Sequence, residues 1–298
     1  MSYSPTQFKG TGVALVTPFH ADKTIDFNAL ENIVNHCIQH GVNYLVVLGT
    51  TGESPVLSAD EKNSIFEAVA RFTNGRVPLV AGIGGNNTAL VINEMREFKH
   101  RTAYSAFLSV TPYYNKPTQA GLIEHYAAIA GMSPLPIILY NVPGRTGVTM
   151  LPKTTLHLAH TYKNIIAVKE ASGSMQACYE LVNGKPNNFL VLSGDDDLVM
   201  PQLACGMDGV ISVAAQCFTA DFCKMVQAAL DQDIATARGL HYKLIAGVNL
   251  LFKEGNPVGV KAALHQLGLC ENQLRLPLVP ASTELYTAIA AFQAKIKA

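Results

Sequence analysis

Lys169 is the residue whose surroundings point most directly to chemistry. It ends the run Ile165–Lys169 (IIAVK), in which every other residue is apolar. An ammonium group is costly to bury in such a strand. Desolvation in a closed pocket favours the neutral form of an amine, and a neutral amine can attack a ketone to form a Schiff base. The alternative is an ordinary lysine that pairs with Glu170 or reaches solvent at the rim.

Four further residues could assist such a reaction. Tyr140 carries a phenol that could act as general acid or base, unless it is simply part of the core. Thr50 and Thr51 precede Gly52, where backbone N–H groups could hold a carboxylate; a plain turn is the alternative. Arg145 follows a Pro-Gly pair and offers a guanidinium fork for a second carboxylate, unless it is a solvated loop charge.

Other combinations of residues are weaker candidates. His36 and His40 lack the glutamate of an HExxH pattern, and no two cysteines form a CxxC pair. Gly82–Gly85 (GIGG) lacks the GxGxxG spacing of a dinucleotide loop. Asp195–Asp197 could hold a cation, but the sequence favours a solvated loop there. We therefore expect neither a metal ion nor a cofactor.

The elements that would position these residues follow a regular rhythm. Short apolar runs recur, each followed by a cluster of Gly, Thr, Asn or Asp and then by a longer amphipathic stretch. The runs are continuously apolar, which is typical of parallel strands covered on both faces. Eight runs fit this description: Gly12–Phe19, Tyr44–Thr51, Leu79–Gly85, Ala106–Tyr114, Pro136–Pro143, Ile165–Ser172, Phe189–Asp196 and Gly209–Val213.

Eight strands that alternate with helices predict a (β/α)8 TIM barrel, with an open doubly wound sheet as the alternative. In such a barrel the catalytic groups lie at the C-terminal ends of the strands, where Thr50, Tyr140 and Lys169 fall. Capping residues mark two of the helices: Asp26 and Gly41 flank one, and Ser58 opens the other with a capping box. The four helices predicted between strands are Phe27–His40, Ser58–Phe72, Thr88–Lys99 and Gln119–Ala130.

The barrel does not account for the whole chain. We expect residues 1–230 to form the (β/α)8 catalytic domain and residues 231–298 to form a C-terminal helical region packed on it. The predicted helices of this part of the chain are Phe218–Leu230, which closes the barrel, and then Ala235–Phe252, Pro257–Leu267 and Thr283–Lys297.

The composition excludes several classes of protein. The 298 residues carry 22 Lys+Arg and 22 Asp+Glu, so the net charge is zero and a broad nucleic-acid interface is not expected. Hydrophobic residues make up 49% of the chain, which excludes general disorder. The N-terminal residues do not resemble a secretory signal, and no apolar stretch is long enough to span a membrane. With its scattered cysteines, the sequence predicts a cytoplasmic protein.

Seven motifs occur in an order and spacing that identify a known family. They are Gly49–Ser54 (GTTGES), Val110–Pro117 (VTPYYNKP), Tyr140–Gly147 (YNVPGRTG), Val168–Gly173 (VKEASG), Ser193–Asp196 (SGDD), Gly209–Val213 (GVISV) and Phe252–Lys261 (FKEGNPVGVK). Together they closely resemble the dihydrodipicolinate synthase / N-acetylneuraminate lyase family of class I aldolases. The match spans nearly the whole chain.

The resemblance implies how the catalytic residues would divide the work. Lys169 would be the Schiff-base lysine, and Tyr140 would be the proton donor and acceptor. Thr50 and Tyr114 would complete the proton relay. In this family the tyrosine that matches Tyr114 crosses a subunit interface, and the implied assembly is a homotetramer built as a dimer of dimers.

The resemblance also implies which residues bind the substrates. Thr51 and the backbone of Ile211 would hold pyruvate, with Gly194 lining the pocket. Arg145 would bind the carboxylate of aspartate 4-semialdehyde. Within the family, this arginine favours the branch that condenses these two substrates in lysine (diaminopimelate) biosynthesis, without a cofactor. It argues against a lyase or aldolase for N-acetylneuraminate or another 2-keto acid.

Two alternatives lie outside this chemistry. A non-catalytic ketoacid-binding paralogue is disfavoured because Lys169, Tyr140, Thr50 and Tyr114 are all present. A phosphate-binding isomerase barrel would need a glycine-rich site after the last strands, and the segment from Gly209 (GVISVAAQ) is a poor one.

The chain departs from the family at the site where feedback-inhibited members bind lysine. Ser54, Asn86 and Tyr113 of that site are kept, and they could form a residual effector site. Lys62 and Leu90 replace a histidine and a glutamate. A bound lysine would therefore lose an acceptor and meet a like charge, so we expect weak or absent inhibition.

Overall fold

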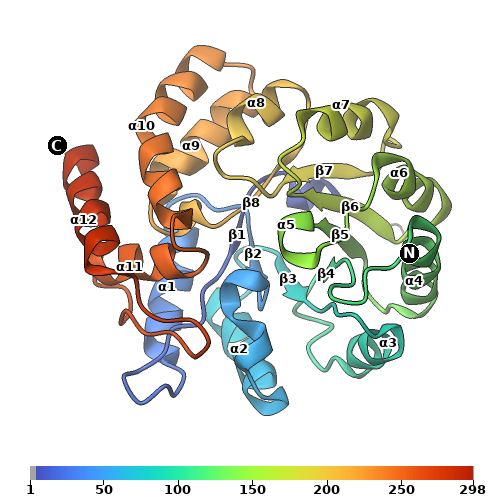
Figure 1. The fold of residues 1–298 in the computed structure, drawn as a ribbon, viewed down its shortest axis with the longest axis horizontal. Helices are drawn as coiled ribbons and strands as arrows, with labels where there is room; N and C mark the ends of the chain where they lie inside the picture. Colours follow the sequence, from blue (N-terminus) through green and yellow to red (C-terminus); the bar gives the residue numbers. More distant parts are fainter. Residues whose placement is uncertain (1–4, 298) are drawn as a thin grey trace.

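Eight parallel strands close into a barrel in the computed structural model of the chain, which describes residues 5–297 (Figure 1). Each strand pairs with the next along the chain, and β8 pairs with β1, which confirms the predicted (β/α)8 fold. The strands are β1 Gly10–Ala14, β2 Tyr44–Val47, β3 Leu79–Gly82, β4 Ala106–Val110, β5 Ile137–Asn141, β6 Ile165–Glu170, β7 Leu190–Ser193 and β8 Gly209–Ser212.

Helices surround the barrel, and their ends follow local capping chemistry. The Asp26 side chain accepts the Ala29 N–H at the start of α1, and Gly41 after it has φ 95°, as the sequence predicts. Ser58 and Glu61 form the predicted capping box of α2. The barrel helices are α1 Phe27–Gln39, α2 Ala59–Thr73, α3 Thr88–Glu97, α4 Gln119–Met132, α5 Pro143–Thr146, α6 Pro152–Thr161, α7 Met175–Gly184, α8 Val199–Ala204 and α9 Thr219–Leu230.

The strands end earlier than the apolar runs suggest. β2 stops at Val47 because Leu48 takes a left-handed conformation, with φ 59°. Thr50–Gly52 then forms a short 3₁₀ helix, η2, in place of the last part of the predicted strand. The polar residues of the motif therefore lie on a turn above the barrel, which lets their side chains and N–H groups face its mouth.

An apolar cluster fills the barrel interior, and it is separate from the larger core between the strands and the helices. Phe8 and Tyr44 fill its N-terminal end, with ring centroids 5.4 Å apart in an edge-to-face arrangement. Tyr140 and Ile211 belong to the same inner cluster. Apolar packing thus seals one end of the barrel and leaves polar groups to the other.

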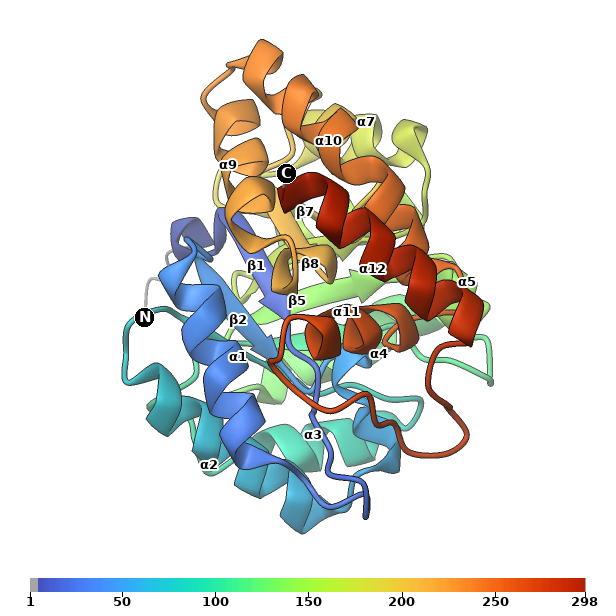
Figure 2. The ribbon, with the colours of Figure 1, turned by 90° about the vertical axis from the view of Figure 1, so that its left-hand side faces the viewer.

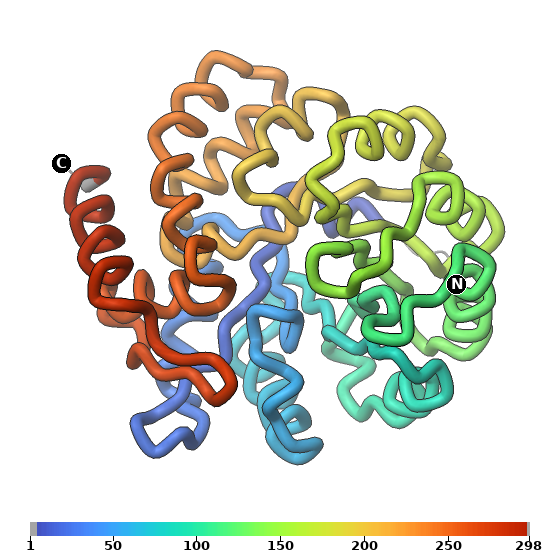
Figure 3. The backbone as a smooth tube through the Cα atoms, viewed as in Figure 1, coloured from blue at the N-terminus to red at the C-terminus, as the bar shows by residue number. Residues whose placement is uncertain are grey.

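Three helices follow the barrel and lie along one side of it: α10 Ile234–Phe252, α11 Val258–Gln266 and α12 Thr283–Lys297. Figure 2 shows them beside α9 and α1. The long connection between α11 and α12, seen in the backbone trace of Figure 3, contacts the segment that leads from β2 into α2. The chain passes from α9 to α10 between Leu230 and Ile234, where we predict the second region to begin. Within residues 5–297, no helix is both long and apolar enough to cross a membrane.

Candidate active site

A cavity of about 380 Å³, here called the lysine cavity, opens at the C-terminal ends of the strands. It collects residues from η2, β5, β6 and the loops after β7 and β8, together with the segment before α11. Six of the residues predicted from the sequence line it: Thr50, Thr51, Tyr140, Arg145, Lys169 and Gly194.

Lys169 is buried, with 5% of its surface exposed. It pairs in register with Tyr140 on the neighbouring strand, so both side chains point to the same face of the sheet. The Lys169 Nζ atom lies 4.6 Å from the centroid of the Tyr140 ring. Among residues 5–297 Lys169 forms no ion pair; Glu170 instead accepts hydrogen bonds from the Asn141 amide and the Ser172 N–H. The alternative of a Lys169–Glu170 pair is therefore wrong.

Gly194 makes room for the lysine. A Cβ atom at this position would lie 2.5 Å from the Ala171 Cβ and 3.0 Å from the Lys169 Cε. Real Cβ atoms essentially never make the first of these approaches, and the second would require the Lys169 side chain to shift by a few tenths of an ångström. The sterics of the loop after β7 thus help to hold the amine in the cavity.

Thr51 receives a hydrogen bond that sequence reasoning did not anticipate. The Asn256 amide Nδ2 donates to the Thr51 Oγ1 at 2.9 Å, in a buried contact. Because the hydroxyl accepts this bond, its own proton remains available for a bound carboxylate. Thr50, the first residue of η2, is half-buried and lines the same cavity.

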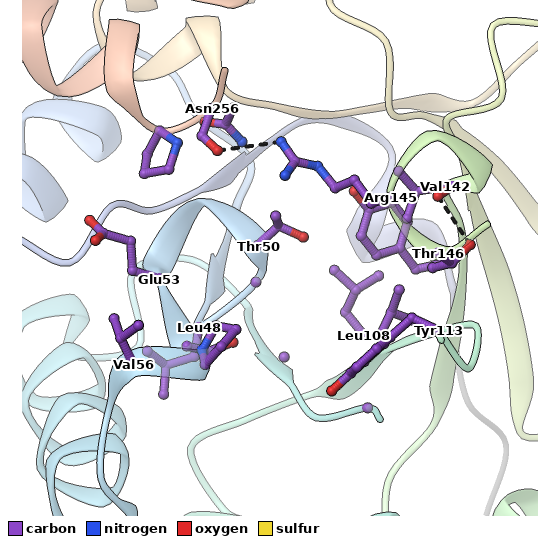
Figure 4. Close-up of a pocket in the computed structure, with 18 of the residues that line it drawn as sticks. Leu48, Thr50, Glu53, Val56, Leu108, Tyr113, Val142, Arg145, Thr146 and Asn256 are labelled. Carbon is purple, nitrogen blue, oxygen red and sulfur yellow. Dashed lines mark hydrogen bonds between the residues drawn. The ribbon is translucent and has the colours of Figure 1, made fainter. Parts of the chain in front are cut away.

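Arg145 lies on the short helix α5, and its side chain extends toward Asn256 (Figure 4). Its guanidinium donates to the Asn256 carbonyl at 3.3 Å. Asn256 therefore contacts Thr51 through its side chain and Arg145 through its backbone. The sequence signal for Asn256 was its place before a proline in the motif Phe252–Lys261.

The acidic residues after β7 are not the solvated loop that the sequence favours. Asp196 is 3% exposed, and its Oδ2 accepts the N–H groups of Val213 and Ala214. Asp195 lines the lysine cavity and accepts the Gly173 N–H at 3.0 Å. Burial raises the pKa of Asp195 to about 6. The expectation of a solvated loop is therefore wrong for Asp195 and Asp196, because Asp196 bonds to the end of β8 and Asp195 lines the cavity. It is correct for Asp197, which is exposed.

A second cavity of about 370 Å³, here called the outer cavity, adjoins the first (Figure 4). Thr50, Tyr140, Arg145 and Asn256 line both. Its other walls are mainly apolar and include the end of β4 and the connection between α11 and α12.

The predicted effector residues lie around the outer cavity. Ser54 and Tyr113 line it, and the Asn86 amide donates to the Tyr113 carbonyl at 3.2 Å. Leu90 is 64% exposed on α3. Lys62 lines a separate cavity of about 310 Å³ between α2 and α3. The three retained residues are thus close together, whereas Lys62 lines a different cavity and Leu90 is exposed on α3.

Two of the predicted catalytic and substrate-binding residues do not line the lysine cavity. Tyr114 follows β4 with φ 72°, and 88% of its surface is exposed. Ile211 lies on β8, and its side chain belongs to the inner apolar cluster. Val213, two residues later, lines the cavity. A single chain therefore brings together the lysine, one tyrosine, two threonines and the arginine, but not the second tyrosine.

The site offers groups for covalent chemistry on a small anion. A buried amine, a phenol and hydroxyls face the cavity, and an arginine lies at its mouth. No group of three or more His, Cys, Asp or Glu side chains in the described part of the chain could hold a metal ion. The arrangement favours an amine nucleophile with proton transfer by hydroxyl groups.

Comparison with known proteins gives a consistent result. The profile of the Dihydrodipicolinate synthetase family matches residues 7–296. The 4-hydroxy-tetrahydrodipicolinate synthase of Flavobacterium psychrophilum is 50% identical over 278 residues, covering 93% of this chain and 94% of that protein.

Two solved structures are similar over nearly their full length. The dihydrodipicolinate synthase of Thermotoga maritima has a TM-score of 0.94 at 37% identity, covering 98% of this chain and 99% of that one. The enzyme of Acinetobacter baumannii, solved in complex with pyruvate, has a TM-score of 0.94 at 38% identity, covering 97% and 99%.

Proposed function

The chain belongs to the dihydrodipicolinate synthetase family, and we infer that it is a 4-hydroxy-tetrahydrodipicolinate synthase. This lyase of the class I aldolase type condenses pyruvate with aspartate 4-semialdehyde in lysine biosynthesis. The observation that carries the inference is the buried amine of Lys169 beside Tyr140 in a cavity with Arg145 at its mouth.

The reaction begins with Schiff-base formation. The Lys169 Nζ attacks the C2 ketone of pyruvate and forms a carbinolamine. Tyr140, together with Thr50, shuttles the protons that allow the hydroxyl group to leave as water. Thr51 and the backbone of Ile211 hold pyruvate.

Carbon–carbon bond formation follows from the iminium. The positive nitrogen acidifies the methyl protons at C3, and loss of one proton gives an enamine. The enamine C3 attacks the aldehyde carbon of aspartate 4-semialdehyde, and the new alkoxide takes up a proton. The substrate amino group then attacks C2, closes the ring and releases Lys169. The iminium itself is the electron sink, so the protein's own residues suffice.

Arg145 sets the choice of the second substrate. Its guanidinium can bind a carboxylate through two parallel hydrogen bonds. The contact with Asn256 holds it over the mouth shared by the two cavities. This placement supports the synthase reading over a lyase for N-acetylneuraminate or another 2-keto acid.

The active unit is proposed to be a homotetramer built as a dimer of dimers. Tyr114 is almost fully exposed in the single chain and lines neither cavity, whereas the outer cavity leads to Thr50 and Tyr140. We propose that the partner subunit's Tyr114 enters this cavity and completes the proton relay. The site would then be complete only in the dimer.

The six cysteines support a cytoplasmic location. All are free, and Cys37, Cys178 and Cys217 are buried. Burial raises the pKa of each of these thiols, which makes them poorly reactive. Free thiols are typical of a reducing compartment.

One experiment tests the proposed chemistry directly. The protein is incubated with pyruvate and sodium borohydride, and the Lys169 peptide is examined by mass spectrometry. We expect a reduced pyruvate adduct on Lys169, none in Lys169→Arg, and turnover when aspartate 4-semialdehyde is supplied in a coupled assay. An unmodified Lys169 peptide would overturn the Schiff-base role.

A further inference from the structure

Glu53 and Lys261 form a fully buried ion pair between the barrel and the helices that follow it. The Lys261 Nζ lies 2.5 Å from the Glu53 Oε1, and the two side chains are 0% and 1% exposed. Lys261 also donates to the Gln273 carbonyl at 2.8 Å and lies 4.2 Å from the centroid of the Phe19 ring. The second carboxylate oxygen of Glu53 accepts the backbone N–H of Arg275 at 3.1 Å.

The position of Glu53 in the chain makes this pair important for the site. Glu53 directly follows η2, the turn that carries Thr50 and Thr51, and its N–H donates to the Thr50 carbonyl. In Figure 4 its side chain points away from Thr50, and Glu53 lines the outer cavity but not the lysine cavity. Anything that holds Glu53 therefore also fixes the end of the turn.

The turn needs such support because its backbone is strained at both ends. Leu48 has φ 59° and Glu53 has φ 53°, in a region that residues with a Cβ rarely occupy. Conformations of this kind persist only where surrounding contacts hold them. Thr17 supplies one contact, since its hydroxyl donates to the Gly52 carbonyl at 2.7 Å. The buried pair supplies the anchor at Glu53.

The same part of the chain also reaches the reacting groups. Lys261 lies on α11, five residues after Asn256, whose amide holds the Thr51 hydroxyl. The segment before and within α11 thus fixes the turn at two points: Asn256 at Thr51, and Lys261 at Glu53. Both contacts come from beyond the last barrel helix, α9.

We propose that Glu53 and Lys261 are positioning residues for pyruvate binding, and that they lock the Thr50–Gly52 turn in the geometry that receives the pyruvate carboxylate. The pair acts through the turn and touches no substrate. The helices after the barrel then help to position the active site. This inference rests on the proposed function, because pyruvate is the ligand whose binding it concerns.

Two variants test this positioning role by removing the charges of the pair while keeping side chains of similar shape. Glu53→Gln leaves Lys261 without its counter-ion, and the double variant Glu53→Gln/Lys261→Met removes both charges. We expect Glu53→Gln to lower the melting temperature and the double variant to regain most of it, because an unpaired buried charge is costly. In both, we expect kcat/KM for pyruvate to fall about tenfold or more, whereas KM for the aldehyde changes less than twofold.

Glu61→Gln is the matched control. Glu61 pairs with the Arg275 side chain and joins α2 to the same connection, but it does not touch η2. We expect its kinetic constants to stay within twofold of the wild type. A double variant that regains both stability and pyruvate kinetics would overturn the proposal, because the pair would then serve folding only.

A third variant is used if neither Glu53→Gln nor the double variant folds. Glu53→Asp keeps the charge pair and shortens the tether by one methylene. We expect a folded protein with slower borohydride trapping of pyruvate on Lys169 and a raised pyruvate KM; unchanged trapping would refute the lock. Failure of the wild-type protein itself to trap pyruvate would instead overturn the proposed function.

Discussion

Lys169 and Tyr140 face each other from neighbouring strands, with the amine 4.6 Å from the centroid of the phenol ring. The contact fixes two things at once. It gives a buried cation an electron-rich neighbour when the lysine is protonated, and it places the phenol beside the atom where a carbinolamine would form. Proton transfer to a leaving hydroxyl needs this closeness.

Replacing the Tyr140 hydroxyl should separate binding from chemistry. Tyr140→Phe keeps the ring that lies beside Lys169 but removes the proton carrier. We expect kcat to fall by about 10²-fold or more, the usual range for loss of a general acid or base. Tyr44→Phe is the control, because Tyr44 also faces the barrel interior but lies at the closed end, where its hydroxyl donates to the Val210 carbonyl. Equal losses in both variants would contradict a special role for Tyr140.

Tyr114 can be tested by mixing two inactive proteins. Tyr114→Phe and Lys169→Arg should each be nearly inactive alone. If each site takes Lys169 from one subunit and Tyr114 from its partner, random reassortment yields about a quarter of the native sites. We therefore expect about a quarter of wild-type activity after co-expression. Activity no greater than that of the separate variants would show that Tyr114 serves its own chain.

Arg145 should affect the second substrate and spare the first. Arg145→Lys keeps the charge but loses the planar fork for a carboxylate and the contact with the Asn256 carbonyl. We expect KM for aspartate 4-semialdehyde to rise about tenfold, which corresponds to about 1.4 kcal/mol. Borohydride trapping of pyruvate should stay within twofold of wild type. Equal loss of both would place Arg145 in pyruvate binding instead.

The barrel and its main chemical residue could be predicted from the sequence because both leave local signals. Eight apolar runs mark the strands, and Lys169 stands out as the one cation within such a run. Capping residues such as Asp26 and Ser58 act over three positions, so they too can be identified locally. The strand ends could not be placed, because Leu48 leaves the sheet through a backbone conformation that side-chain pattern does not reveal.

Contacts between distant segments could not be predicted in this way. Asn256 meets Thr51 across 205 positions of sequence, and no periodicity reports which loop reaches the mouth of a barrel. Glu53 and Lys261 likewise look like ordinary charged residues until the fold brings them together in a buried pair. A run of acidic residues predicts a solvated loop at Asp195 and Asp196, but the fold buries Asp196 and places Asp195 in the wall of the lysine cavity.

Asp195 should make stability depend on pH. Burial raises its pKa from 3.8 to about 6, so folding favours the neutral acid. The corresponding stability is present below about pH 4 and is lost as the pH rises through 6, by at most about 3 kcal/mol. Asp195→Asn should therefore gain stability over the wild type between pH 5 and pH 8 in urea unfolding. Asp197→Asn removes a like charge that contributes less to this shift than burial does, so it should show a smaller gain. A gain independent of pH at Asp195 would contradict the argument.

Lysine should inhibit this enzyme weakly or not at all. Ser54, Asn86 and Tyr113 remain grouped near the outer cavity, but Lys62 would repel a cationic ligand and Leu90 cannot accept its hydrogen bonds. Steady-state assays should show little inhibition at millimolar lysine, and inhibition in the micromolar range would refute this. The double variant Lys62→His/Leu90→Glu restores an acceptor and removes the like charge, so we expect it to be inhibited at lower lysine concentrations. The exposed Glu124→Gln is a control that should leave the response unchanged.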